Sequence, residues 1–295
     1  MTTTLHDEPP EGPGSYRFFH RLRVRWAEVD MQKVVFNAHY LMYLDTAIAD
    51  YWRALALPYE ESMVALGGDL FVRKSTLDYH TSARLDDMLD IGLRCRRIGG
   101  SSLTFDGGIY RAGRLLAQGE IVYVFADPTS HVPCNVPEAM RSLLQGYEAG
   151  EPVTALRIGD WEQLGTDAAK VRTAVFVQEQ NVPEEEEWDE DDATAVHVVV
   201  YNRLGMPLAT GRLLPPVAGV GRIGRMAVHR VLRGCGVGRV VLETLIGESR
   251  RRGDTAVELH AQRSAEGFYD RAGFQPFGDP FDEVGIPHIG MRRIL

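Results

Sequence analysis

The stretch from residue 223 to residue 253 constrains the fold more than any other part of this chain. A short apolar run over 223–228 predicts a strand, a glycine-rich turn follows at 233–238, and an amphipathic helix then continues to 253. The first turn of a helix has unpaired N–H groups, and glycine lets a ligand approach them closely. The stretch therefore predicts a turn that binds a phosphate between a strand and a helix.

Two better-known phosphate motifs do not fit this turn. No Gly-Lys-Ser or Gly-Lys-Thr ending follows it, which excludes a Walker loop. Gly234, Gly236 and Gly238 are too closely spaced for the dinucleotide fingerprint, which would need a third glycine where Arg239 stands. Taken alone, the turn is also compatible with an ordinary tight turn that binds nothing.

Downstream strings narrow the choice. Residues 268–274 read Phe-Tyr-Asp-Arg-Ala-Gly-Phe, and with the Arg-Gly-Cys-Gly-Val-Gly of 233–238 they resemble the GNAT N-acetyltransferase family. Val-Phe-Val-Gln-Glu-Gln at 175–180 and Gly-Ile-Pro-His-Ile-Gly-Met at 285–291 are similar to its ElaA-like branch. At Gln262 many relatives carry asparagine, a difference that is consistent with that branch.

The resemblance implies acetyl transfer from acetyl-CoA to an amine, with a mixed sheet and flanking helices. Tyr269 matches the general acid of the family, while the alternative is a core tyrosine that packs against Phe274. The residues implied in binding acetyl-CoA are Met226, Ala227, Val228, Arg233, Gly234, Cys235, Gly236, Val237, Gly238 and Arg239.

The base that deprotonates the amine stays open. The candidates are Glu179, Glu258, His260 and His288, with relay by water as a further alternative, and His288 is also a candidate for binding the acceptor. Residues 184–192 hold eight acids. This run could attract a cationic amine, or it could be a solvated loop, which is the more common role of such runs.

The first half of the chain has a different pattern. Residues 37–57 carry apolar side chains at helical spacing on more than one face, so we expect a largely buried helix. Strand-like runs lie at 18–26, 70–80, 88–97, 102–111 and 115–125. The pattern predicts one long helix wrapped by an antiparallel sheet.

The string over residues 25–41, Arg-Trp-Ala-Glu-Val-Asp-Met-Gln-Lys-Val-Val-Phe-Asn-Ala-His-Tyr-Leu, resembles hotdog-fold acyl-CoA thioesterases of the 4-hydroxybenzoyl-CoA thioesterase or YbgC type. Residues 83–91 fit the same family. Two departures occur: Glu28 stands where the family often has the first aspartate of Asp-x-Asp, and Lys33-Val34-Val35 lacks a glycine that often precedes the two valines. The resemblance implies thioester hydrolysis and a homodimer or higher homo-oligomer.

Asp30 matches the acid that this family uses, as nucleophile or to activate water, and the alternative is an aspartate that braces its loop. Backbone N–H groups at the start of the following helix would polarise the thioester carbonyl. Asn37 and His39 are candidates for contacts with the substrate, but Asn37 could instead cap the helix and His39 could be a half-exposed helix residue.

At 295 residues, the chain has room for two domains. We therefore expect an α+β protein with a flexible tail at 1–15, a hotdog domain at 16–150 and a GNAT domain at 151–295. Scattered cysteines at 95, 134 and 235 argue against a metal site and favour the cytoplasm. The net charge of −9 argues against nucleic acid, and no apolar run approaches membrane-spanning length. Alternatives are that one half alone is catalytic, or that the chain is a CoA-binding sensor or scaffold.

Overall fold

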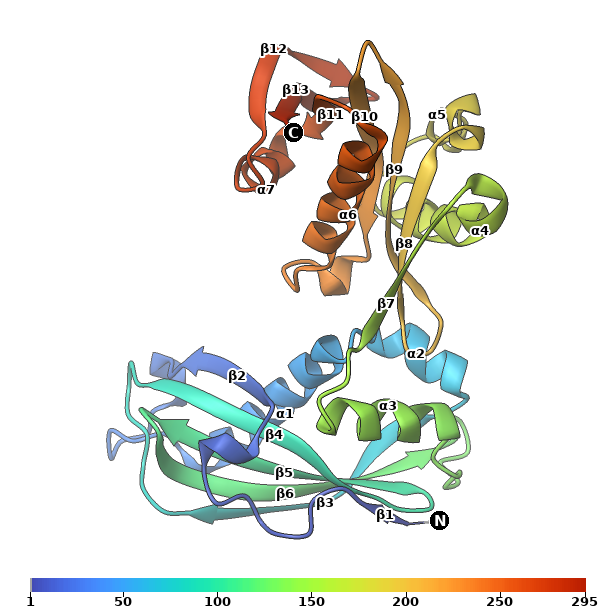
Figure 1. Ribbon diagram of the computed structural model, residues 1–295. Helices are drawn as coiled ribbons and strands as arrows, with labels where there is room; N and C mark the ends of the chain where they lie inside the picture. The colour runs from blue at the N-terminus through green and yellow to red at the C-terminus, as the bar shows by residue number, and fades with distance from the viewer. Residues whose placement is uncertain (1) are drawn as a thin grey trace. The chain divides into compact units, whose positions relative to one another are not determined.

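The computed structural model describes residues 2–295, which divide into two compact units at residues 153 and 154. Each unit is an α+β fold with its own sheet, antiparallel in the first and mixed in the second, so the expected fold class is confirmed (Figure 1). Within residues 2–295, no helix is long and apolar enough to cross a membrane.

The first unit is a curved antiparallel sheet that packs against one long helix, α1 (Figure 1). The strand order is β1-β4-β5-β6-β3, and β2 also pairs with β4. The strands are β1 (Thr3–Thr4), β2 (Phe18–Arg23), β3 (Asp69–Tyr79), β4 (Met88–Ile98), β5 (Ser102–Arg111) and β6 (Arg114–Ala126). The helices are α1 (Asn37–Ala54), α2 (Tyr59–Leu66) and α3 (Glu138–Glu148), with short 3₁₀ turns at Pro13–Ser15 and Trp26–Glu28.

Glycines in the sheet bring α1 close to it. Leu44 in α1 is completely buried. A Cβ added at Gly107 of β5 would lie 2.5 Å from a Leu44 methyl carbon, and one at Gly119 of β6 would lie 3.2 Å from the other. Side chains at these two positions would therefore push the helix off the sheet, since protein interiors are close-packed. This contact explains why the long apolar helix and the sheet form a single core.

The first residues of the chain do not form the flexible tail that we expected for 1–15. Thr3 and Thr4 pair with Ile98 and Arg97 of β4, and the Leu5 N–H donates to a β4 carbonyl over 2.8 Å. β4 has a free edge at this place, because β2 covers it only as far as Leu93. The free edge therefore takes up the chain terminus. Met1 lies outside the described residues.

The second unit is a mixed sheet of seven strands in the order β12-β13-β11-β10-β9-β8-β7. The strands are β7 (Thr154–Gly159), β8 (Val196–Asn202), β9 (Pro207–Val217), β10 (Val220–Val228), β11 (Ala256–Gln262), β12 (Gln275–Glu283) and β13 (Ile286–Ile294). The helices are α4 (Trp161–Arg172), α5 (Glu184–Glu187), α6 (Val237–Arg252) and α7 (Glu266–Asp270). A π-helix, Thr173–Glu179, continues α4, and 3₁₀ turns lie at Glu190–Ala193, Arg230–Leu232 and Arg263–Ala265.

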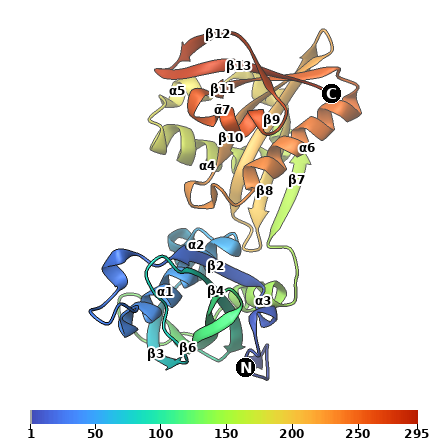
Figure 2. The ribbon, with the colours of Figure 1, turned by 90° about the vertical axis from the view of Figure 1, so that its left-hand side faces the viewer.

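The helices α4 and α6 cover opposite faces of this sheet, and β8 shows why. Its side chains alternate, so that Val198 and Val200 join the cluster under α6 while Val199 and Tyr201 join Leu164 of α4. Figures 1 and 2 show the two helices on the two sides of the strands. All of these β8 side chains are buried, as expected for a strand covered on both faces.

Candidate functional site

The strands β10 and β11 separate from each other in the middle of the second sheet. They are parallel neighbours, yet the ladder joins only Val220–Arg222 to residues 256–258. Both strands continue past this point, β10 to Val228 and β11 to Gln262. The part of β10 after Arg222 therefore presents its edge to an open wedge instead of to a neighbouring strand, where a ligand can pair with backbone groups.

A bulge shapes the β10 side of the wedge. The register against β9 shifts between Gly224 and Ala227. Within the shift, Arg225 has a φ of 50°, a left-handed conformation that costs a residue with a side chain on the order of 1–3 kcal/mol. Strain of this kind is common at functional sites, and here it turns β10 just before its last residues.

After the bulge, the backbone N–H and C=O groups of the three residues expected at the thioester do not all point the same way. His229 donates its N–H to the Leu208 carbonyl of β9 over 2.8 Å. Backbone N–H and C=O groups point to alternate sides along a strand, so those of Ala227 also point to β9, while those of Met226 and Val228 point to the wedge. The Val228 carbonyl accepts from Arg233 Nε at 3.2 Å, away from β9, which agrees with this assignment. Ala227 instead packs against the α4 side through its buried methyl group.

The glycine-rich turn follows β10 and begins α6. Gly234 and Gly236 have φ values of 83° and 85°, and Gly236 is the N-cap of α6. A Cβ at Gly238 would lie only 3.2 Å from a Val228 methyl carbon, so a bare glycine lets the helix start close to β10. Cys235 is exposed at the same turn, and so is Arg239 one turn into the helix. The first N–H groups of α6 are thus presented where an anion can reach them.

Arg233, one of the residues expected to bind pyrophosphate, holds a bidentate ion pair with Glu179. The two bonds measure 2.6 and 2.7 Å. The bonds from Arg233 are the main reason why the pKa of Glu179 is lowered. This pairing was not visible in the sequence, because 54 residues separate the partners.

A cavity of about 370 Å³ opens at the wedge. Tyr269 of α7 lines it, although its ring also packs against Phe274 at a centroid distance of 6.0 Å, so both expected roles of this tyrosine are compatible with its position. Burial raises the pKa of Tyr269 to about 12, so the phenol keeps its proton at neutral pH. Gln262 also lines the cavity and donates to the side-chain oxygen of Gln180 over 2.9 Å.

Two histidines reach the cavity from neighbouring strands. His260 of β11 has Nδ1 3.1 Å from a guanidinium nitrogen of Arg222, and burial lowers its pKa, with the Arg222 charge acting in the same direction. His288 of β13 is 8% exposed, and its Nδ1 lies 2.7 Å from the Ile286 carbonyl oxygen. The ring of Phe281 stacks on His288 at 5.9 Å.

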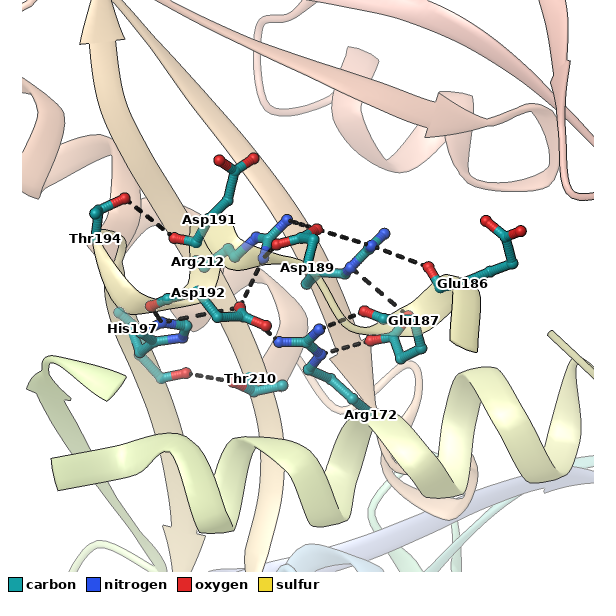
Figure 3. A network of polar contacts seen from close by, with 12 residues as sticks. Arg172, Glu186, Glu187, Asp189, Asp191, Asp192, Thr194, His197, Thr210 and Arg212 are labelled. Carbon is teal, nitrogen blue, oxygen red and sulfur yellow. Dashed lines mark hydrogen bonds and ion pairs between the residues drawn. The ribbon is translucent and has the colours of Figure 1, made fainter. Parts of the chain in front are cut away.

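Two acids of the acidic run, Glu187 and Asp192, are buried in ion pairs, while the other six are exposed (Figure 3). Arg172, 1% exposed, donates to Glu187 at 2.5 Å and to Asp192 at 2.8 Å. Arg212 bonds Asp192 at 2.6 Å and also pairs with Asp189. Burial raises the pKa of Glu187, despite the opposing charge of Arg172. The solvated-loop interpretation is therefore wrong for Glu187 and Asp192, since buried charges require partners, while the exposed acids of the run agree with it.

In the first unit, Asp30 lies in the loop before α1 and lines an open hollow with Trp26, Met31 and Lys33. One carboxylate oxygen of Asp30 accepts the Gln32 N–H over 2.8 Å, so this side chain does brace its loop. It is only partly buried, which leaves it accessible from the hollow.

Glu28, the first acid of the loop, has a different environment. It is 3% exposed and accepts from the Tyr43 hydroxyl at 2.8 Å and from the Arg25 backbone at 2.7 Å. Burial acts to raise the pKa of Glu28, but these hydrogen bonds outweigh it and lower the pKa. Glu28 therefore has a structural role in holding the loop against α1.

Asn37 does not cap α1. The N-cap is Phe36, with no hydrogen bond from its side chain, and Asn37 is exposed while its backbone carbonyl accepts from the Tyr79 hydroxyl at 3.1 Å. An asparagine one residue inside the helix cannot make the bond that a cap makes. His39 is partly buried, as expected, and its Nδ1 is buried without a hydrogen-bond partner among residues 2–295.

Comparison with known proteins assigns both halves. The model of the thioesterase-like superfamily matches residues 24–144, and the model of the GNAT acetyltransferase domain matches residues 165–295. The uncharacterized N-acetyltransferase YjcF of Bacillus subtilis is 38% identical over 45% of this chain and 93% of its own length. Escherichia coli ElaA is 37% identical over 42% of this chain and 83% of its own length.

A solved structure, the 1,4-dihydroxy-2-naphthoyl-CoA thioesterase from Synechocystis, is 18% identical over 43% of this chain and 94% of that one, with a TM-score of 0.40. The two family models coincide with the two sheets described above and with the motifs at residues 25–41 and 233–238. The chain therefore belongs, through its second half, to the GNAT acetyltransferase family, and it joins that domain to a thioesterase-like domain of the hotdog fold.

Proposed function

We propose that both halves act on CoA thioesters, hydrolysing an acyl-CoA in residues 16–150 and transferring an acetyl group from acetyl-CoA to an amine in residues 151–295. The observation that carries the proposal is the cavity at the wedge between β10 and β11, which Tyr269 lines and from which β10 leads to the glycine-rich turn. The family of each half supports it. Acetyl-CoA and acyl-CoA are then substrates, and the proposal includes no metal.

In the transfer reaction, the wedge holds the thioester. The N–H groups of Met226 and Val228 polarise its carbonyl, and the first amides of α6, with Arg239 nearby, bind the pyrophosphate. The amine nitrogen attacks the carbonyl carbon, and the C–S bond breaks as the tetrahedral intermediate collapses. The departing thiolate takes its proton from the hydroxyl of Tyr269, which is still protonated at neutral pH.

In the hydrolysis reaction, the carboxylate of Asp30 attacks the acyl carbon or takes a proton from the water that does. Three exposed or half-exposed apolar side chains border Asp30 and suit an acyl chain: Trp26, Met31 and Leu85. Asn37 and His39 lie at the start of α1, where they would contact the substrate.

We include a homodimer in the cytoplasm in this proposal. β3 lies at the end of the first sheet, pairs with β6 on one side, and is exposed over most of its length. A second copy would cover such an edge. The three cysteines are free thiols, which suits a reducing compartment.

The proposal is tested by measuring thiol release from a panel of acyl-CoA esters, with and without a panel of amines. Asp30→Asn should reduce the amine-independent release, and Tyr269→Phe the amine-dependent release, each by about 10²–10⁴-fold, which is typical of lost acid, base or nucleophile catalysis. The amide oxygen of the introduced asparagine could still accept the Gln32 N–H, so the loop should survive the change and only the charge is lost.

Each variant is the control for the other, because Asp30 and Tyr269 lie in different units. If each activity survives the loss of its own residue, both site assignments are wrong. If the wild type releases no thiol from any ester but still binds CoA, the sensor or scaffold alternative holds. Release of one kind alone would show that a single half is catalytic.

A further inference from the structure

The structure separates the four side chains that the sequence offered as the base of the second unit. Glu179 is held by Arg233 in a bidentate pair, which lowers the pKa of Glu179. Glu258 is paired with Arg292 at 2.5 Å. Neither of the two carboxylates lines the cavity at the wedge. Both are therefore poor proton acceptors for an amine bound there.

His260 does line the cavity, but both of its ring nitrogens lie beside the guanidinium of Arg222, at 3.1 Å for Nδ1 and 3.5 Å for Nε2. Whichever nitrogen of the neutral ring has the lone pair, a cation that can only donate is next to it. Nδ1 also lies 3.5 Å from a carboxylate oxygen of Glu283. Burial lowers the pKa of His260, and the Arg222 charge acts in the same direction while Glu283 opposes it.

His288 has the opposite arrangement. Its Nδ1 faces the carbonyl oxygen of Ile286 at 2.7 Å, and a carbonyl can only accept, so Nδ1 carries the proton. The lone pair is then on Nε2, since the one hydrogen bond of the His288 side chain within residues 2–295 is that of Nδ1. An imidazole whose tautomer is fixed by a backbone carbonyl is poised to accept a proton at its other nitrogen.

The neighbouring strands fix the position of this ring. His288 pairs with Gln262 of β11 on one side and with Phe281 of β12 on the other, and the ring of Phe281 stacks on it. Directly paired residues point to the same face of a sheet, so His288 and Gln262 both project to the face that lines the cavity. The ring is thus held rigidly in the cavity that Tyr269 also lines.

The geometry points to His288 as the group that takes the proton from the acceptor amine, an inference that rests on the proposed acetyl transfer. As the amine nitrogen forms its bond to the acetyl carbon, the carbonyl π electrons move to oxygen and the N–H proton moves to His288 Nε2. When the C–S bond breaks, the thiolate takes a proton from Tyr269. One proton is accepted and one is donated, so the two residues divide the acid and base steps.

Other ionisable groups line the same cavity from each surrounding element. They are Arg212 of β9, Arg222 and Arg225 of β10, His260 of β11, Tyr269 of α7, Glu283 of β12, and Glu186, Glu187, Asp189 and Asp191 of the acidic run. Among these, His260 is the second imidazole, and both of its ring nitrogens lie beside Arg222. An acid limb in the pH profile can therefore be assigned only by comparing variants.

The test is steady-state acetyl transfer by the full chain from pH 5 to pH 9, using an amine that the wild type accepts. For His288→Gln, we expect kcat to fall by about 10²-fold or more, with the KM for acetyl-CoA unchanged, because the wedge and the turn that bind acetyl-CoA are intact. The wild-type rate should rise with pH as an imidazole loses its proton, and this limb should disappear in the variant. Tyr269→Phe, the matched variant in the same cavity, should lose rate but keep the limb.

Chemical rescue distinguishes a lost base from a lost fold. Added imidazole should restore part of the activity of His288→Ala and none of that of Tyr269→Phe. If His288→Gln keeps the wild-type kcat and acid limb, or if it loses only acetyl-CoA binding, then His288 is structural and the inference is wrong. If the wild type shows no amine-dependent thiol release at all, the failure is that of the proposed transfer itself.

Discussion

At the scale of single residues, backbone conformation decides which substitutions the sites tolerate. Gly234 and Gly236 have positive φ values, as a glycine-rich turn before a helix leads one to expect. Lys33 is the opposite case, since it stands where related thioesterases often have glycine and yet adopts a φ of 62°. The loop next to Asp30 therefore contains a left-handed residue at an energetic cost.

Replacing Lys33 by glycine should relieve that cost. A side chain in the left-handed region costs about 1–2 kcal/mol, which glycine avoids. Glycine also gives the unfolded chain more conformational entropy, which offsets part of this gain, so we expect Lys33→Gly to stabilise the first unit by about 0.5–1 kcal/mol. Gln32→Gly, one residue earlier and without a positive φ, is the matched control and should destabilise by a similar amount. Denaturant unfolding of both variants checks this, and equal effects of the two would contradict it.

At the scale of elements, the sequence predicted most strands to within a few residues, because alternation and glycine-rich turns are local signals. It missed what depends on partners far along the chain. Glu187 and Asp192 are buried because they form ion pairs with Arg172 and Arg212, which are 15 to 20 residues away in the sequence. The same limit hid Arg225, whose place at the bulge follows from how β10 pairs with β9.

His197 of β8 makes this buried network sensitive to pH. It is 1% exposed, and burial lowers its pKa below the ordinary value, although a bond to the Asp192 carbonyl opposes this. Below about pH 6.5, the ordinary pKa of histidine, the unfolded chain then binds a proton that the folded chain refuses. Stability should therefore fall as pH drops, by at most about 1.4 kcal/mol per pH unit from this group.

Hydrogen exchange of the β8 amides between pH 7.5 and pH 5 measures this dependence. Rates must first be corrected for the intrinsic effect of pH on exchange. His197→Gln should flatten the dependence, since glutamine does not titrate in this range. A dependence as steep as that of the wild type in this variant would mean that another group is responsible.

At the scale of the whole molecule, the division into two units and the class of each sheet followed from the sequence, since each half carries its own apolar pattern and motif. The proposed assembly of copies came from the family resemblance instead, and it would use the free edge of β3. Of two successive strand residues, one directs its N–H toward β6 and the other toward the free edge. Proline at each position in turn therefore separates assembly from folding.

We expect one of Ser75→Pro and Thr76→Pro to fold and sediment as a monomer of 32.9 kDa, and the other to lose the β3–β6 ladder. The wild type should sediment at twice that mass. Sedimentation equilibrium with circular dichroism checks both points. A folded dimer for both variants would show that β3 is not the interface.

The π-helix at Thr173–Glu179 depends on the number of residues in this segment as well as on their chemistry. It holds one residue more per turn than the α-helix it continues, and Gln180, whose N–H donates to Val175, ends it at the cavity wall. Loss of a single codon in this segment would restore an ordinary helix, and the residues that follow would keep nearly the same orientation, because a π turn takes up about one residue more than an α turn. Phe176 and Gln180, which both line the cavity, would then stay on nearly the same side of the helix, so the length of this segment could change in evolution without displacing the cavity wall.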